Sequence, residues 1–186
     1  MHAALRNQLA GEPIAQLRAF DPLADAGHAV RVADLSLRIA AVFGEPVQPH
    51  DLYLAACLHD LGKAELHHLV QLPRPLTQEE RQCMESHATC GAVMAQTLLG
   101  VSDTVKAYVL HHHEQWGGCG YPLGLRGEAI PLGARIIAIA DTFDALVSDR
   151  PYRAGWSRPD ARAYVLARGG CQFDPRLLLA FELATA

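Results

Sequence analysis

The sequence predicts an all-α protein that forms one helical domain. Apolar residues recur every three or four positions along most of the chain, the period of an amphipathic helix, and no segment shows the alternation of a half-buried strand. Glycines and prolines separate these segments at short intervals, as expected for helices joined by short loops. With 186 residues, 50% of them hydrophobic, the chain can bury a full core. We place the domain at residues 21–186, after a loosely amphipathic helical lead-in at residues 1–20.

Charge and cysteine content exclude several classes of protein. The net charge is −4 and the lysines and arginines are scattered, so the chain lacks the continuous positive surface that a long nucleic acid requires. None of the five cysteines forms a C-x-x-C pair, which argues against a zinc ribbon or a disulfide framework. There is no signal-peptide pattern, and no apolar run approaches the ~20 residues that span a bilayer. We therefore expect a soluble cytoplasmic protein that binds neither a long nucleic acid nor a membrane.

The first helix of the domain is expected to begin at Asp21-Pro22, an N-cap followed by a proline, and to run through His28 to about Phe43. Gly44 then ends it. Taken alone, His28 would be an ordinary surface or capping residue.

The second predicted helix carries the pair His59-Asp60. It begins near residues 49–51 and ends at Gly62, and three apolar residues on the face of His59 extend that stripe towards the core. Burying an imidazole and a carboxylate is costly without a partner, and a metal ion is an economical one. Taken alone, the pair could equally be a helix end with a hydrogen-bonded histidine. The proline-rich residues 64–76 should form an irregular loop with solvated histidines.

Two further helices also lead to histidines. A capping box at residues 77–80 begins one that carries His87, and Gly91 would allow a close helix crossing after it. The next helix, about residues 103–114, contains three consecutive histidines at 111–113. Neighbouring side chains project about 100° apart around a helix, so two of them can flank one site while the third points elsewhere.

A shaped loop and an apolar helix follow. Residues 116–122 contain three glycines and a proline and cannot be helical. Residues 132–147 form the most apolar helix, within which Asp141 and Asp144 lie three positions apart. Each buried aspartate needs a compensating partner; an arginine or a helix terminus could supply it for Asp144, and the histidines indicate a metal for Asp141. The remaining helices are expected to begin after Ser157 and at Asp174-Pro175.

Seven of these side chains have the composition of a metal cluster. Helix bundles build such clusters from histidines and carboxylates on facing helices, and seven ligands exceed the three or four of one zinc ion. Two metals about 3.5–4 Å apart can activate a hydroxide and neutralise a phosphoryl oxygen, so phosphodiester hydrolysis uses such a site best. The candidate ligands are His28, His59, Asp60, His87, His112, His113 and Asp141.

Short motifs in a fixed order carry a resemblance to a known family. They are His28 with Arg31-Val32, His59-Asp60-Leu61-Gly62-Lys63, His112-His113-Glu114 with Gly120-Tyr121-Pro122, Ala140-Asp141-Thr142-Phe143-Asp144-Ala145-Leu146, Asp149-Arg150-Pro151-Tyr152-Arg153, and Phe173-Asp174-Pro175. From about Asp21 to Phe181 the chain resembles HD-domain phosphohydrolases, and in particular their HD-GYP subgroup.

The resemblance implies a compact helical bundle with a dinuclear metal site in its core, and a bacterial phosphodiesterase that hydrolyses cyclic di-GMP to pGpG, with GMP as a further candidate product. It implies that the seven residues bind two divalent first-row ions, iron or manganese before zinc or nickel. Lys63 would contact the scissile phosphate or the leaving oxygen, Arg150 and Arg153 would hold a ligand phosphate, and Tyr121 would border the substrate pocket. A metal-bridging hydroxide would attack phosphorus, with Asp60 and Lys63 in the catalytic centre.

Two positions depart from the family pattern. Members with a third metal carry a glutamate where this chain has Ala24, so we expect two metals; the neighbouring Asp25 is read as a capping side chain that could reach the same face. Gly117 stands where the family usually has Asp or Asn. The missing side chain removes a hydrogen bond, so the loop should be more mobile, with reduced activity or a changed substrate.

Two other functions remain open at this stage. The chain could hydrolyse another nucleotide, such as a different cyclic dinucleotide or a guanosine polyphosphate. Alternatively it could bind cyclic di-GMP, or dock onto a diguanylate cyclase of the GGDEF type, without turnover. The complete set of candidate ligands argues against such a sensor, whereas Gly117 argues for it. The chain leaves no room for a receiver or sensory domain, so it is either a stand-alone enzyme or an excised domain.

Overall fold

The computed structural model describes residues 27–70, 72, 74–149 and 154–186, and within them the fold is all-helical, as predicted. The expected Asp21-Pro22 cap lies outside these residues. The one pairing of extended residues in the described chain is an isolated bridge between Gly169 and Phe173. The α-helices are α3 (His28–Phe43), α4 (Pro49–Leu58), α5 (His67–Val70), α6 (Gln78–Glu85), α7 (His87–Leu99), α8 (Asp103–His111), α9 (Leu132–Val147), α10 (Arg158–Leu166) and α11 (Leu178–Thr185); the 3-10 helices are η1 (Leu61–Leu66), η2 (Gly127–Ala129) and η3 (Pro175–Leu177).

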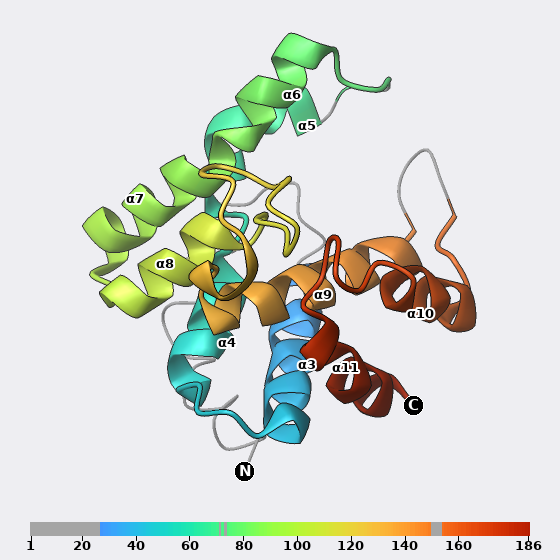
Figure 1. The fold of residues 1–186 in the computed structure, drawn as a ribbon. Coiled ribbons are helices and arrows are strands. Elements are labelled where there is room, and N and C mark those ends of the chain that lie inside the picture. The colour runs from blue at the N-terminus through green and yellow to red at the C-terminus, as the bar shows by residue number, and fades with distance from the viewer. Residues whose placement is uncertain (1–26, 71, 73, 150–153) are drawn as a thin grey trace.

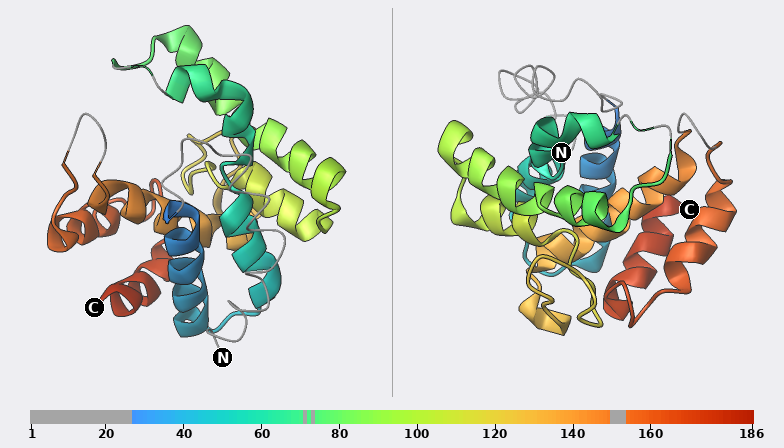
Figure 2. Two further views of the ribbon diagram at one scale, coloured as in Figure 1. Left: turned by 180° about the vertical axis from the view of Figure 1, so that it is seen from behind. Right: turned by 90° about the horizontal axis from the view of Figure 1, so that it is seen from above.

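Helix α9 crosses the middle of the molecule, with α7 and α8 on one side and α10 and α11 on the other (Figure 1). The view from behind shows α3 and α4 side by side below it (Figure 2). Helix α3 packs against α4, α9 and α11, and α8 packs against α4, α7 and α9. Ile136, Ile137 and Ile139 of α9 are completely buried. Each such side chain contributes about 1.5–3 kcal/mol, which explains why the most apolar segment occupies the centre.

Several helix ends lie where the local sequence signals place them. Helix α3 ends at Phe43, and Gly44 adopts the left-handed conformation (φ 81°) that favours glycine. The capping box of α6 is complete, because Thr77 accepts a hydrogen bond from the Glu80 N–H and the Glu80 side chain accepts one from the Thr77 N–H. Ser157 caps α10, as predicted, by accepting a hydrogen bond from the Asp160 N–H. Signals that act within one turn are therefore sufficient at these positions.

The second predicted helix is shorter than expected. Helix α4 ends at Leu58, and after His59 and Asp60 the chain continues as the 3-10 helix η1. Gly62 does not end a helix. It lies against α7 so closely that a Cβ atom would be 2.1 Å from the His87 carbonyl oxygen and 2.7 Å from the Gly91 amide nitrogen. The close approach predicted for Gly91 is thus confirmed, with Gly62 as its partner.

Two other expectations about the same region were wrong. Residues 64–76 are not wholly irregular, because η1 runs to Leu66 and α5 follows at residues 67–70; His68 is exposed, as expected. The helix expected to run from the capping box through His87 is broken at Ser86, which ends α6 and begins α7. The break lets α7 begin at the candidate ligand His87. None of the helices in the described parts of the chain has both the length and the hydropathy of a membrane span.

Candidate metal centre

The structure brings all seven candidate ligands together at one place in the core. They come from segments that are far apart in the sequence: the start of α3, the turn between α4 and η1, the start of α7, the end of α8 and the middle of α9. His59, His87 and His112 are almost completely buried. The seven residues are His28, His59, Asp60, His87, His112, His113 and Asp141.

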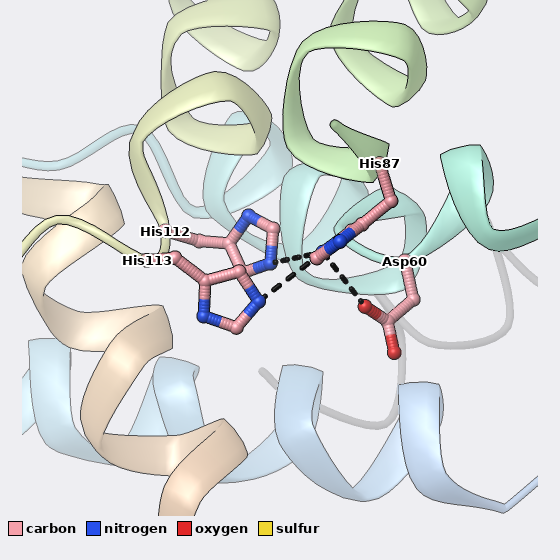
Figure 3. A group of neighbouring side chains, drawn as sticks. All are labelled: Asp60, His87, His112 and His113. Carbon is pink, nitrogen blue, oxygen red and sulfur yellow. Dashed lines mark hydrogen bonds and ion pairs between the residues drawn. The ribbon is translucent and has the colours of Figure 1, made fainter. Parts of the chain in front are cut away.

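One group contains three histidines and a carboxylate. The ligand atoms of Asp60, His87, His112 and His113 all lie within 4.8 Å of one another. In Figure 3 these side chains point towards a common centre, with His87 in the middle. His87 Nε2 is 3.1 Å from His113 Nε2 and 3.4 Å from His112 Nε2. Its distance from Asp60 Oδ1 is 3.5 Å.

A second group shares Asp60 with the first. His28, His59 and Asp60 also offer ligand atoms within 4.8 Å of one another. Asp141 borders this group, because its Oδ1 is 3.2 Å from His28 Nε2 and 3.7 Å from His59 Nε2. Asp60 therefore lies between the groups, with Oδ2 3.5 Å from His59 and Oδ1 3.5 Å from His87. This is the position of a carboxylate that can bridge two cations.

Backbone carbonyls determine which ring nitrogen carries the hydrogen in three of these histidines. Each ring donates its Nδ1 hydrogen to the carbonyl oxygen three residues earlier, which leaves the Nε2 of the neutral ring as an acceptor that faces the centre. Metal-binding histidines are held in this way, with one nitrogen donating to the protein and the other binding the ion. The bonds are His59 to Ala56 (2.7 Å), His87 to Met84 (2.6 Å) and His112 to Val109 (2.6 Å).

This arrangement is costly without a cation. The Nε2 atoms of His87 and His112 are both acceptors when both rings are neutral, yet they face each other at 3.4 Å. Two more buried acceptors, His59 Nε2 and Asp60 Oδ1, have no hydrogen-bond partner. Buried polar atoms without a partner cost free energy, and a metal ion would satisfy all of them at once. The nitrogen and oxygen donors, with no thiolate among them, suit a divalent first-row ion.

The pKa values of the group that contains Asp60 and the three histidines favour the protonation states that metal ligands need. Burial alone would raise the pKa of Asp60, but the charges of Lys63 and His59 outweigh it and hold that pKa well below its usual range. Burial, together with the neighbouring histidines, lowers the pKa of His112, and burial lowers that of His113 to about 3. At neutral pH the carboxylate is therefore ionised and these rings are neutral, as ligands must be.

His28 is held by carboxylate side chains where the three histidines above are held by backbone carbonyls. Burial would lower its pKa, but hydrogen bonds to Asp141 and Asp144 outweigh burial and raise the pKa to about 10. Its Nδ1 lies 2.7 Å from Asp144 Oδ2, and Arg31 Nε donates to Asp144 Oδ1 at 2.7 Å. The prediction that an arginine compensates Asp144 is confirmed. The link from Asp144 to His28 was not predicted, because 116 positions separate the two residues.

Two of the predicted substrate-contacting residues lie beside the centre. Lys63 is partly exposed, and its Nζ contacts Asp60 Oδ2 at 2.5 Å. The ring of Tyr121 lies over that of His113, with 4.8 Å between ring centroids, and burial raises the pKa of its phenol. The other two, Arg150 and Arg153, lie outside the described residues, as do Ala24 and Asp25.

Sequence reasoning missed the role of Glu114. This buried carboxylate accepts hydrogen bonds from the backbone N–H groups of Leu123 (2.8 Å) and Leu125 (2.9 Å), and so fastens the loop that carries Tyr121. Its position, directly after the histidine pair and before a glycine-rich loop, was the available signal. The third histidine of the tract, His111, belongs to neither group and faces Glu114 instead, as the 100° rule predicts.

Gly117 lies where the loop meets a later segment of the chain. Its N–H donates to the Cys171 carbonyl at 2.7 Å, and a Cβ atom there would lie 3.0 Å from the same oxygen. The neighbouring Trp116 N–H donates to the Gln172 carbonyl at 3.1 Å. The backbone and Glu114 thus supply hydrogen bonds that fasten the loop where this chain has no side chain at position 117.

Comparison with known proteins places this geometry in a family. The model of the HD domain matches residues 14–177. A cyclic di-GMP phosphodiesterase of Vibrio cholerae is 43% identical over 137 residues, which cover 70% of this chain and 28% of that protein. A 3'3'-cGAMP-specific phosphodiesterase of the same organism is 39% identical over 132 residues, 70% of this chain and 30% of that protein. The chain thus spans less than a third of either relative's length.

A solved structure shows the same fold. Bd1817, a HDG"Y"P protein from Bdellovibrio bacteriovorus, superimposes with a TM-score of 0.68 at 23% identity, and the match covers 97% of this chain and 60% of that one. The ordered motifs, the helical fold and the matched family model agree, and the chain belongs to the HD domain family.

Proposed function

We propose that this chain is a metal-dependent phosphodiesterase that hydrolyses cyclic di-GMP to pGpG, with GMP as a further candidate product. The observation that carries the proposal is Asp60, whose two oxygens face two separate sets of histidine nitrogens. A bridged pair of metals suits phosphodiester hydrolysis, because one reaction then has both a polarised water and a neutralised phosphoryl oxygen. The relative named as a cyclic di-GMP phosphodiesterase supports the choice of substrate.

The residues that would hold two divalent first-row ions, iron or manganese first and zinc or nickel next, fall into two sets. His87, His112 and His113 would bind one ion, and His28, His59 and Asp141 the other, with Asp60 shared. When bound, the ions supply activation of water and neutralisation of phosphate charge. Ala24, at the position where some family members have a glutamate, favours two ions over three.

The protein's own groups have separate tasks around the phosphate. Lys63 is the partly exposed cation at the edge of the centre, where it can donate to a scissile phosphate or a leaving oxygen and stabilise the charge that develops there. Tyr121 would border the pocket that holds the dinucleotide. Arg150 and Arg153 are proposed to bind ligand phosphate, since a guanidinium can donate to two oxygens at once.

A second candidate function is hydrolysis of a different cyclic dinucleotide. The relative named for 3'3'-cGAMP is almost as similar as the one named for cyclic di-GMP, with 39% against 43% identity. Gly117, in the loop beside the centre, is the departure from the family pattern that bears on this choice. A cytoplasmic location and contact with a diguanylate cyclase of the GGDEF type stay predictions.

The test is turnover by protein purified without oxygen, with metal content measured on the same sample. We expect two metals per chain and hydrolysis of cyclic di-GMP faster than that of 3'3'-cGAMP. Asp60→Ala should lose both metal and turnover, because it removes the shared ligand. Glu65→Ala, an exposed carboxylate in η1, is the matched control and should keep both. Binding of cyclic di-GMP without turnover in a metal-loaded sample would support a sensor and contradict the proposal.

A further inference from the structure

A charged network lies behind one of the two ligand sets. Asp144 is buried on α9, one turn after Asp141. Arg31 of α3 donates to both of its carboxylate oxygens, from Nε to Oδ1 at 2.7 Å and from Nη2 to Oδ2 at 3.0 Å. The Nδ1 of His28 lies 2.7 Å from the same Oδ2. Ser148 closes the network, with its Oγ 3.4 Å from Oδ2.

This support differs in kind from that of the other ligand histidines. His59, His87 and His112 donate their Nδ1 hydrogens to carbonyl oxygens of their own chain segments. His28 is the first residue of α3, so no earlier turn of that helix can offer it a carbonyl. A carboxylate from another helix, Asp144, takes that place. Because Asp144 fixes the Nδ1 hydrogen, Nε2 is left to face Asp141 and the metal centre.

Charge gives the network a second effect. A carboxylate acceptor makes the imidazole a stronger electron donor than a carbonyl does. Asp144 also pairs with Arg31, whose cation would otherwise stand close to His28 and oppose the binding of a metal ion there. Both effects act on the set that contains His28. Neither acts on the three-histidine set, whose rings have their own carbonyl partners or face His87.

We propose that Asp144 is a positioning residue that sets the metal affinity of the His28–His59 half of the centre and leaves the three-histidine half unaffected. This inference rests on the two-metal centre of the proposed function. Partners that orient a metal-binding histidine are worth about 10–100-fold in metal affinity. A substitution at Asp144, which is not a candidate ligand, should therefore change the affinity for one metal ion and not for the other.

The experiment is calorimetric titration of metal-free protein with Mn²⁺, comparing wild type with Asp144→Asn, a replacement of nearly the same shape. Wild type should bind two ions. The variant should bind one ion with unchanged affinity and the other about 10–100-fold more weakly. Asp160→Asn, an exposed carboxylate on α10, is the matched control and should titrate like wild type.

A second variant keeps the inference testable if Asp144→Asn unfolds. Arg31→Lys keeps the positive charge but loses the two-pronged contact, so it should weaken the same single ion by a smaller factor. The thermal unfolding temperature of each metal-free variant separates a local effect from a loss of fold. Equal weakening of both ions, or of neither, overturns the inference. If wild type itself does not bind two ions, the proposed function fails with it.

Discussion

At the scale of single residues, the direction of one imidazole nitrogen decides what a histidine can do. His111 and His112 are neighbours and both are buried, but only His112 aims Nε2 at the centre. The Nδ1 of His111 lies 3.7 Å from Glu114, on the other side of the helix end. The sequence shows that two of three consecutive histidines can share a site. It cannot show which two, because that depends on how α8 is rotated against its neighbours.

The pair of neighbours offers a matched test. His112→Gln should lower metal content by about one ion per chain and abolish turnover, because it removes a ligand from the three-histidine set. His111→Gln changes the adjacent residue in the same way and should keep its metal. Metal analysis by mass spectrometry on both purified variants checks this. Equal metal loss from the two would show that the tract acts through folding and not through ligation.

A second residue, Glu114, holds a loop through hydrogen bonds and is not one of the candidate metal ligands. Each carboxylate oxygen of Glu114 accepts one backbone N–H, from Leu123 or from Leu125. Glu114→Gln replaces one of these oxygens by an NH2 group, which cannot accept, so one of the two hydrogen bonds is lost. Hydrogen bonds to a charged group are worth about 1.5–3 kcal/mol. Because Tyr121 lies in this loop, we expect the KM of the Glu114→Gln variant for the dinucleotide to rise about tenfold or more. Its metal content should be unchanged. Glu79→Gln, at an exposed residue of α6, should leave the KM as it is. Metal loss in the Glu114 variant would contradict this account.

At the scale of elements, the local signals predicted where most helices begin and end, and failed where a distant segment decides. Gly44 and the capping box act within one turn, and the helix ends there were predicted correctly. The change from α4 to η1 depends instead on the approach of Gly62 to α7, about thirty positions later in the sequence. The same contact lies just after the break at Ser86, which directly precedes His87. The candidate ligands that the structure brings together could be named from the sequence, but the backbone path between them could not.

The close approach of η1 and α7 predicts the effect of one methyl group. In Gly62→Ala the new Cβ atom would meet the His87 carbonyl oxygen at 2.1 Å, so α7 has to move. Overpacking of this kind costs about 1–3 kcal/mol and should displace His87 enough to weaken its metal set. Gly44→Ala is the control: it is strained by its positive φ, but its Cβ atom would meet open space far from the ligands. Denaturant unfolding and metal content measure both; a Gly62 variant with normal metal binding would contradict the prediction.

At the scale of the whole molecule, buried ion pairs tie the last helices to the loop that borders the centre. Asp174 is buried, accepts from Arg135 at 2.5 Å and Arg176 at 2.9 Å, and caps η3. Both guanidinium groups also lie within 5.6 Å of the ring of Trp116, at the base of the loop that leads to Tyr121. The carboxyl-terminal helices therefore support the loop that borders the candidate metal centre.

This support predicts a dependence of stability on pH. Burial would raise the pKa of Asp174, but hydrogen bonds from Arg176 and Arg135 outweigh it, and the pKa is lower folded than unfolded. The ionised group therefore stabilises the fold above its unfolded pKa of about 3.9, and that stability is lost as the pH falls through the lower folded value. Asp174→Asn should cost about 3 kcal/mol at neutral pH, because Arg135 is left buried without its charge partner. Its unfolding free energy should also fall less steeply below about pH 4 than that of wild type; an unchanged slope would contradict the assignment.

The central claim is that helices from five parts of the chain meet so that Asp60 lies between two cations. Anomalous diffraction from crystals of the metal-loaded protein tests it most directly. We predict two peaks, one next to His87, His112 and His113 and the other next to His28, His59 and Asp141, with an oxygen of Asp60 towards each. A single peak, a third peak, or ions bound away from Asp60 would contradict it.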